Sequence, residues 1–287
     1  MVNPYLDYVS HLAQLLRDGA RLPLGGLPPL ARPPAAADAP CVLVFSPHPD
    51  DECIIGGLPL RLQREAGLRI VDVAVTQGSL KERQGPRWDE LRAACTFLGW
   101  ELVGTRPGGL ERITREARER DPAHWRRSVD VIADILERLQ PAVVFAPHDA
   151  DWNSTHIGTH HLVMDALARQ PAGFACAVVE TEFWGAMTAP NLMVESNAED
   201  VANLMAALSF HAGEVRRNPY HLRLPAWLID NVRRGGEVVG GQGGAAPDFT
   251  FATLYRMRRW AGGALRTSFD GGRVVAANTN AGEAMRD

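Results

Sequence analysis

The chain has 287 residues and a formal net charge of −4, with 46% apolar and 22% charged side chains. This length suits one large domain, or one domain with an appendage. The weak acidic charge argues against a nucleic-acid-binding protein, which would carry a basic excess or stripe. No run approaches the ~20 apolar residues of a membrane span, and the first residues lack the pattern of a secretory signal. We therefore expect a cytoplasmic protein with no nucleic-acid partner.

The four cysteines are scattered along the chain and form no Cys-x-x-Cys pair. A chain of this length rarely depends on a disulfide framework, and a thiolate zinc site needs paired cysteines. We therefore predict four reduced thiols: Cys41, Cys53, Cys95 and Cys176.

The N-terminal region is expected to be separate from the main domain. Apolar residues recur at helical spacing over residues 5–18, which predicts an amphipathic helix. Residues 22–40 are rich in proline, glycine and alanine, which predicts a linker or an extended surface arm. Residues 1–40 should thus precede one domain over residues 41–287, which becomes irregular from about residue 215.

Short apolar runs alternate with segments of helical periodicity in the main domain. We predict strands over residues 41–46, 69–76, 142–146 and 175–183, and helices over residues 54–67, 87–98, 124–139, 156–170 and 199–209. Pro59 should kink the first of these helices or delay its start. This alternation predicts an α/β fold with a Rossmann-like, mostly parallel sheet and helices on both faces.

The C-terminal part has weaker patterns. Residues 249–257, 264–270 and 273–278 have β character and predict a small β-containing C-terminal portion. Asp270 and Gly271 suit a turn between the last two segments. The glycines of residues 235–244 would permit a mobile lid, although a plain loop is their more common role.

Two polar loops follow directly from predicted strands. Residues 46–52 read Ser-Pro-His-Pro-Asp-Asp-Glu after the first strand, and residues 147–161 begin Pro-His-Asp-Ala-Asp after the strand over 142–146. In a doubly wound sheet, ligands bind outside the carboxyl ends of the strands. Both loops are therefore expected at the same edge of the sheet.

The first loop has the composition of a metal site. His48, Asp50, Asp51 and Glu52 bring together one imidazole and three carboxylates. Such a loop repels itself unless a cation or a basic partner neutralises it. Imidazole with carboxylate oxygen is a zinc ligand set of hydrolytic sites. The alternative is a helix N-cap, in which the acids complement the helix dipole, but this explains the acids and not His48.

The second loop gathers further metal-ligating side chains. A lone histidine is more often an ordinary core or surface residue. Here the acidic loop opposite favours metal binding or catalysis, and His156 and His160 would share a helix face. The candidates are His148, Asp149, Asp151, His156, His160 and His161.

Together the two loops resemble those of the zinc-dependent de-N-acetylases of the GlcNAc-phosphatidylinositol deacetylase and LmbE-like family. The resemblance is carried by residues 46–52, by Thr-His-Ile-Gly-Thr at 155–159, and by residues 87–99, which are similar to the family's Arg-x-x-Glu-Leu helix. It covers roughly residues 41–215. It implies a hydrolase that removes an N-acetyl or other N-acyl group from an amino sugar or sugar conjugate.

The resemblance also implies roles for individual residues. His48, Asp51 and His156 would hold one divalent ion per chain, zinc or another divalent metal, and Asp50 would be the general base. In an alternative register, His160 is the third ligand.

The second motif departs from the family's His-Pro-Asp-His. Asn153 takes the place of the first histidine, and Thr155 takes the place of the aspartate. Asn153 can donate a hydrogen bond to an oxyanion but cannot deliver a proton. His160 or His148 is then the candidate acid.

Substrate contacts are expected from polar and aromatic residues near the loops. Arg87, Glu90 and Asp151 are the polar candidates, although an arginine in such a helix is as often only solvated. Three tryptophans are candidates for stacking on a sugar, although each is more often a core or interface residue: Trp152, Trp184 and Trp227.

The sequence thus predicts a metal-dependent hydrolase with a small-molecule, amino-sugar-like substrate. Two alternatives stay open: an amidase that cleaves a larger acyl or thiol conjugate on the same metal site, and a metal-binding family member without catalysis. A nucleotide-binding module is disfavoured, because the acidic loop occupies the position of the required glycine-rich turn. Homo-oligomerisation also stays open.

Overall fold

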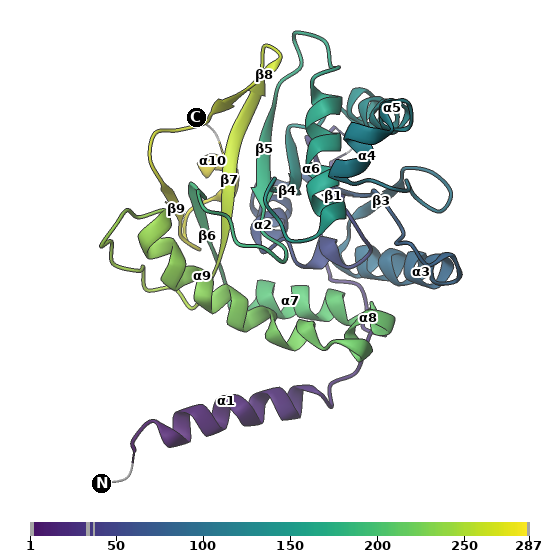
Figure 1. The fold of residues 1–287 in the computed structure, drawn as a ribbon. Coiled ribbons are helices and arrows are strands. Elements are labelled where there is room, and N and C mark those ends of the chain that lie inside the picture. Colours follow the sequence, from purple (N-terminus) through teal and green to yellow (C-terminus); the bar gives the residue numbers. More distant parts are fainter. Residues whose placement is uncertain (1–2, 33–34, 37, 286–287) are drawn as a thin grey trace.

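The computed structural model describes residues 3–32, 35–36 and 38–285. Within them, a nine-stranded sheet has the order β3-β2-β1-β4-β5-β7-β6-β9, with β8 paired to β7 (Figure 1). The parallel pairing of its first five strands confirms the predicted Rossmann-like fold. The strands are β1 (Cys41–Ser46), β2 (Arg69–Ala74), β3 (Glu101–Gly104), β4 (Val143–Pro147), β5 (Cys176–Thr181), β6 (Leu192–Ser196), β7 (Phe251–Ala261), β8 (Ala264–Thr267) and β9 (Arg273–Val275).

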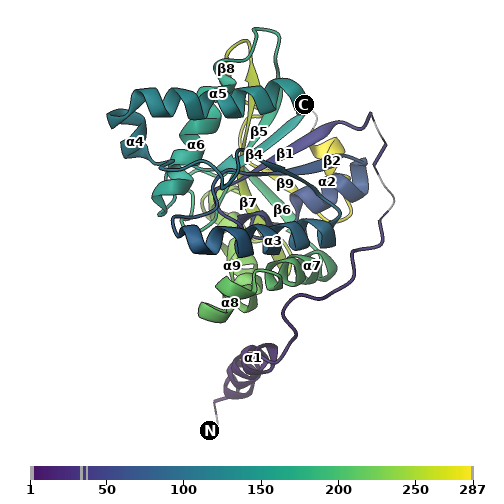
Figure 2. The same ribbon diagram turned by 90° about the vertical axis from the view of Figure 1, so that its right-hand side faces the viewer.

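Helices cover both faces of the sheet. In two perpendicular views, α4, α5 and α6 gather on one side, and α7, α8 and α9 gather on the other (Figures 1 and 2). The helices are α1 (Leu6–Gly19), α2 (Leu58–Ala66), α3 (Lys81–Leu98), α4 (Arg115–Arg120), α5 (Pro122–Leu139), α6 (Ser154–Leu167), α7 (Ala198–Ser209), α8 (Ala212–Arg217), α9 (Leu224–Val238) and α10 (Ala281–Ala284), with short 3-10 helices η1 (Asp51–Cys53) and η2 (Tyr220–Arg223).

All residues of strand β1 are buried. Successive side chains point to opposite sides of the sheet, so β1 contributes to the core on both faces. Val42 and Val44 join the hydrophobic cluster that includes α2, α3 and α7. Leu43 and Phe45 join the second cluster, with α5 and α6. A continuous apolar run is therefore the expected pattern for this central parallel strand.

The C-terminal strands extend the main sheet. β7 pairs antiparallel with both β5 and β6, and β9 pairs with β6. The hairpin is formed by β7 and β8 across Gly262 and Gly263, which both have positive φ. The expectation that 264–270 and 273–278 pair across Asp270 and Gly271 is therefore wrong, because the two segments find different partner strands.

One predicted helix start is wrong, and for α2 the delayed start at Pro59 is confirmed. α2 begins at Leu58, because residues 51–53 form a 3-10 turn and Gly56 has a φ of 85°. Pro59 lies in the first turn, where its missing N–H costs nothing. α3 begins earlier than predicted, at Lys81, and contains Pro86. The sequence did not predict β3, β6, α4, α8, α9 or α10. β3 is a partly exposed strand of four residues and carries little pattern.

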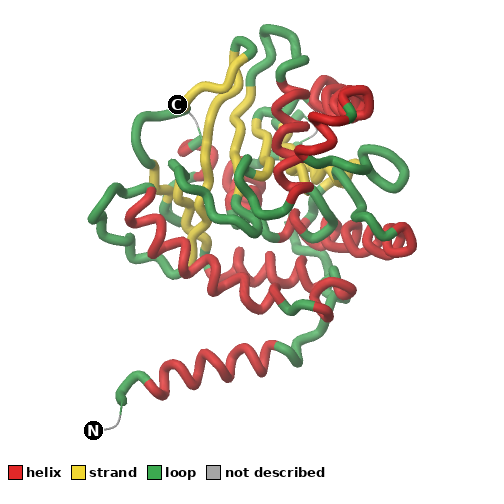
Figure 3. Tube along the Cα trace, in the orientation of Figure 1, coloured by secondary structure: helices red, strands yellow, loops and turns green. Residues whose placement is uncertain are grey.

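Helix α1 is followed by a loop segment (Figure 3). The helix extends away from the sheet and contacts the rest of the molecule near η2 (Figures 1 and 2). None of its residues is buried, so its apolar side chains face outward. None of the described helices combines the length and the apolar character that a bilayer crossing needs.

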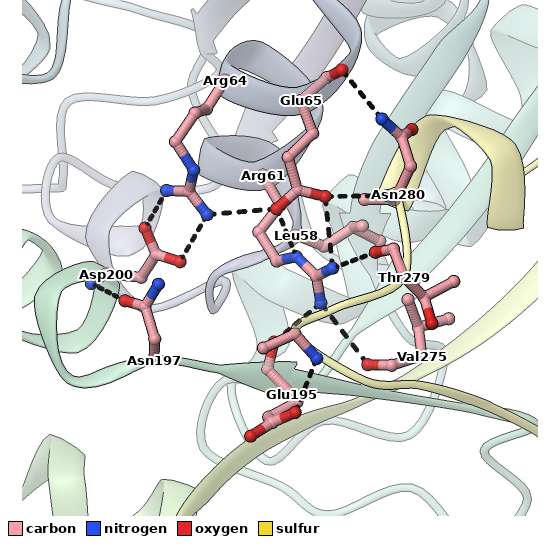
Figure 4. A network of polar contacts seen from close by, with 12 residues as sticks. Leu58, Arg61, Arg64, Glu65, Glu195, Asn197, Asp200, Val275, Thr279 and Asn280 are labelled. Atoms are coloured by element: carbon pink, nitrogen blue, oxygen red, sulfur yellow. Dashed lines mark hydrogen bonds and ion pairs between the residues drawn. The ribbon is translucent and has the colours of Figure 1, made fainter.

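A buried arginine joins α2 to the C-terminal strands (Figure 4). Arg61 is 1% exposed and pairs with Glu65 at 2.8 Å. Its guanidinium also donates to the carbonyl oxygens of Glu195, Ala276 and Thr279. Because the guanidinium is saturated by these acceptors, it ties β6 and the chain after β9 to the helix that follows the first polar loop.

Replacing this arginine should destabilise the whole domain. Arg61→Met removes the buried ion pair with Glu65 and the donor of three carbonyl groups, which should lower the free energy of unfolding by about 3–5 kcal/mol. Urea unfolding followed by circular dichroism would measure the loss. Arg233→Met changes an exposed arginine on α9 and should leave the midpoint almost unchanged. Equal midpoints for the two variants would contradict this role for Arg61.

Candidate functional site

The two polar loops meet where the strand order reverses. β1 lies between β2 and β4: the chain adds β2 and β3 on one side of β1, and then β4 and β5 on the other side. This is the switch point at which doubly wound folds bind ligands. His48 and Asp51 follow β1, and His156 lies in the first turn of α6, which follows β4.

His48, Asp51 and His156 converge on one point. Asp51 Oδ2 lies 3.4 Å from His48 Nδ1 and 3.2 Å from His156 Nε2, and the two ring nitrogens are 3.3 Å apart. Tetrahedral zinc with bonds of about 2.0–2.1 Å separates its ligand atoms by about 3.3 Å. The three atoms thus have the spacing of three corners of such a tetrahedron.

The electrostatics of this group also suit a cation. Burial opposes the charge on Asp51, but His156 and then His48 outweigh it and hold the pKa of Asp51 well below its usual range. An anionic oxygen between two imidazoles is a ligand set that zinc uses in hydrolytic sites. These residues therefore fit a divalent cation. His160 belongs to neither of the two metal-ligating groups found within the described residues.

Asp151 lies behind His156. It is 3% exposed, and its Oδ1 lies 3.6 Å from His156 Nδ1. Its oxygens accept hydrogen bonds from the backbone nitrogens of Asn153, Trp184 and Gly185. A carboxylate in this position orients a ligating imidazole and fixes its tautomer. The predicted substrate contact of Asp151 stays a prediction; its burial and its distance to His156 also suit a carboxylate that positions this imidazole.

Asp50 lies beside the three candidate ligands, with a backbone φ of 115°. Such a conformation costs a non-glycine residue about 1–3 kcal/mol and clusters at functional sites. Its Oδ2 accepts a hydrogen bond from the Tyr220 hydroxyl at 2.5 Å, and its Oδ1 lies 3.9 Å from Arg87 Nη2. Burial, and then the charge of Asp51, raise the pKa of Asp50. A carboxylate held in this way suits a general base.

Tyr220 is a site residue that the sequence did not reveal. It lies 170 positions after Asp50, on η2, and no local pattern marks it. Burial, and then the Asp50 carboxylate, raise the pKa of Tyr220, so its hydroxyl stays a donor. Its ring packs edge-on against Trp184, with 5.5 Å between centroids. The hydroxyl is therefore fixed in place by both contacts.

Glu52 anchors the first loop from the protein interior. Its Oε2 accepts a hydrogen bond from the backbone nitrogen of Asp50 at 2.9 Å, and its Oε1 lies 2.6 Å from His211 Nε2. Burial lowers the pKa of His211, but Glu52 outweighs burial and raises it. The result is a buried ion pair beneath the loop. His211, like Tyr220, lies in a segment without a recognisable motif.

His148 and His160, the two candidate general acids, form hydrogen bonds with backbone groups. His148 is buried, with Nε2 2.9 Å from the Gly185 carbonyl oxygen and Nδ1 accepting from the Ala150 nitrogen at 3.3 Å. His160 Nδ1 donates to the Pro147 carbonyl oxygen at 3.0 Å, and burial lowers the pKa of this imidazole. None of these hydrogen bonds directs either imidazole ring toward Asp50.

Asn153 is the N-cap of α6. Its Oδ1 accepts a hydrogen bond from the Thr155 nitrogen at 2.9 Å. The side-chain oxygen is thus used for capping, while the amide nitrogen keeps its donor capacity. An oxyanion-binding role for Asn153 stays a prediction.

The two polar candidates on α3 have different positions. Arg87 Nη2 donates to the Pro49 carbonyl oxygen at 2.8 Å and also faces Asp50. Glu90 accepts a hydrogen bond from the Gly213 nitrogen at 2.9 Å. Arg87 therefore borders the site, whereas Glu90 holds the start of α8 against α3.

Residues 43–167 match the family model described as PIG-L, GlcNAc-PI de-N-acetylase. This segment resembles that family. The resemblance seen in the sequence is thereby confirmed over these residues, which include both polar loops. No curated protein sequence matches the chain significantly.

Several solved structures share the fold of this chain. The N,N'-diacetylchitobiose deacetylase from Pyrococcus horikoshii has 17% identity and a TM-score of 0.53, over 90% of this chain and 94% of its own. The A40926 pseudoaglycone deacetylase Dbv21 has 16% identity and a TM-score of 0.57, over 78% and 98%. GalB, a 4-carboxy-2-hydroxymuconate hydratase from Pseudomonas putida, has 20% identity and a TM-score of 0.53, over 76% and 95%. At these identities the likeness concerns the fold alone.

Two pockets border the candidate ligands His48, Asp51 and His156, here called the metal-ligating group. A cavity of about 400 Å³, here called the polar pocket, includes His48, Lys81 and Arg112 in its lining. A cavity of about 460 Å³, here called the apolar pocket, includes Trp184 and Trp227. The third candidate tryptophan, Trp152, is 81% exposed and lines neither.

The ligand set can be tested with two histidines of the same helix. His156→Gln should abolish stoichiometric zinc binding, because it removes one of three converging ligand atoms. His160→Gln, one turn later and equally buried, should keep it. Zinc content after dialysis, measured by atomic absorption on folded protein, gives the answer. Loss of zinc in His160→Gln alone would establish the alternative register.

Tyr220→Phe should lower kcat about 10- to 100-fold, because it removes a hydrogen bond to a charged group. KM and zinc content should stay close to those of the unchanged protein, since Tyr220 touches Asp50 and no candidate ligand atom. Steady-state kinetics with a melting curve would measure this. A fall in melting temperature with unchanged kcat would mean that Tyr220 serves only the fold.

Proposed function

We propose that the chain is a divalent-metal-dependent hydrolase that removes an N-acetyl or other N-acyl group from an amino sugar or sugar conjugate. The observation that carries the proposal is the tetrahedral spacing of His48, Asp51 and His156, with Asp50 beside them. The fold alone would not suffice, because a hydratase shares it. The match to a de-N-acetylase family over both loops adds independent support.

The proposed chemistry assigns one task to each group. A divalent ion, with zinc as the first candidate, would supply Lewis acidity that polarises a carbonyl and lowers the pKa of water. Asp50 accepts a proton from the attacking water, and the Tyr220 hydroxyl keeps the carboxylate oriented. The amide of Asn153 donates to the oxyanion of the tetrahedral intermediate.

The same carboxyl group can complete the reaction. When the C–N bond breaks, the proton held by Asp50 passes to the departing nitrogen, so that the products are a carboxylic acid and a free amine; the acid then passes its proton to the amine or to solvent. This assignment needs no second acid. It fits the replacement of the family's histidine by Asn153, and it fits the bonds that occupy His148 and His160.

The cellular setting is also a proposal. All four cysteines are buried free thiols, which supports a reducing compartment such as the cytoplasm. The substrate would then be a small, water-soluble sugar derivative.

Hydrolysis of N-acyl sugars tests the proposed function directly. We expect the zinc-loaded protein to release glucosamine from at least one N-acylglucosamine, with loss of activity on chelation and recovery on adding zinc. Asp50→Asn should lower kcat by at least about 100-fold while zinc stays bound, because Asp50 is not among the converging ligands.

Two results would contradict the proposal. The first is turnover of Asp50→Asn close to that of the unchanged protein. The second is stoichiometric zinc binding without hydrolysis of any N-acyl sugar in the panel, which would indicate a metal-binding protein without this activity.

A further inference from the structure

The apolar pocket lies between the metal-ligating group and the helices that follow the family domain. Its walls include the buried side chains of Ile54, Phe183, Leu208 and Leu224. Of its polar residues, Arg223 is exposed, as is Asn218, which places them toward the surface. A volume of about 460 Å³ is within the range of pockets that hold small organic ligands.

Three lining residues of the apolar pocket touch the site itself. Phe183 packs edge-on against the His156 ring, with 5.0 Å between centroids. The Tyr220 hydroxyl donates to Asp50, and the Ile54 nitrogen donates to the Asp51 carbonyl oxygen at 3.0 Å. The walls of the apolar pocket therefore adjoin the residues around which an amide would react.

The polar pocket reaches the site from another side. It includes His48 itself and Thr155, which precedes His156, together with Lys81 and Glu111. The two pockets have no lining residue in common among those described. A substrate whose amide lies at the metal-ligating group would thus extend one part into polar walls and the other into apolar walls.

We infer that the apolar pocket binds the acyl chain of the substrate, and that this chain is longer than acetyl. An N-acyl sugar has one polar part and one apolar part, joined by the amide, and these match the two pockets. An acetyl group offers a single methyl and would leave the walls formed by Trp184, Leu208 and Trp227 facing water. Residues beyond 167 supply all the lining except Ile54, so the matched family segment does not define this pocket.

This inference rests on the proposed function, and a chain-length series separates the two. We would measure glucosamine release from N-acetyl-, N-butyryl-, N-hexanoyl- and N-octanoylglucosamine. kcat/KM should rise by roughly fourfold for each added methylene that is buried, until the pocket is filled. Failure to hydrolyse any of the four contradicts the proposed function. Hydrolysis of the acetyl compound with no gain for longer chains contradicts only the inference.

Matched variants test the location. Ala226 is small, exposed and part of the pocket lining, so Ala226→Trp should obstruct the pocket without disturbing the core. It should lower the octanoyl-to-acetyl ratio of kcat/KM about tenfold or more. Ile229→Trp changes an exposed residue of the same helix outside the lining and should keep the original ratio. An unchanged ratio in Ala226→Trp would overturn the inference.

A binding measurement gives a readout independent of turnover. In the Asp50→Asn background, N-octanoylglucosamine should bind more tightly than N-acetylglucosamine in calorimetry, and Ala226→Trp should remove the difference. An octyl glycoside of N-acetylglucosamine serves as the comparison compound, because it carries the long chain on the sugar and only an acetyl group on the nitrogen. If this glycoside gains affinity that Ala226→Trp removes, while the N-octanoyl compound gains none, the pocket binds the leaving group and not the acyl chain.

Discussion

The buried carboxylate of Asp51, held between two imidazole nitrogens, is the interaction on which the site depends. A charged oxygen in the interior is costly unless opposite charge or a metal ion compensates it. Here the compensation comes from two segments 108 positions apart. They can meet only because β1 and β4 are neighbours and both loops leave the same edge of the sheet. The Rossmann-like strand order is thus a condition of the chemistry.

Residues from the C-terminal third hold this arrangement in place. His211 pairs with Glu52 beneath the first loop, and Tyr220 fixes the Asp50 carboxylate beside the ligands. Arg61 then ties the helix after that loop to the last strands through backbone carbonyl groups. The chain after β5 therefore supports the candidate site, and it completes the sheet through β7.

The parts of this picture that could be predicted from the sequence are those encoded locally. The buried strand β1 and the residues His48, Asp50 and Asp51 directly after it are close in sequence. A few residues therefore indicate where the first loop lies and which chemical groups it carries. Tyr220 and His211 could not be found in this way, because their roles arise from contacts across 170 and 159 positions. The same reason explains the wrong C-terminal hairpin: strand character is local, but the choice of partner strand depends on the whole sheet.

Relatives that share this fold include deacetylases and a hydratase, so the choice of substrate depends on the walls around the candidate metal site. The segment that matches the family supplies both loops and almost no residue of the apolar pocket, whose walls come from the loop after β5 and from α7, η2 and α9. Selectivity between acyl groups depends on buried apolar area, which changes by a fixed increment with each methylene. Such a wall can change by substitution on an outer helix while the buried Asp51 and its two imidazoles stay as they are. We therefore expect that residues of α9 determine which acyl group is accepted, and that the two loops determine the type of reaction.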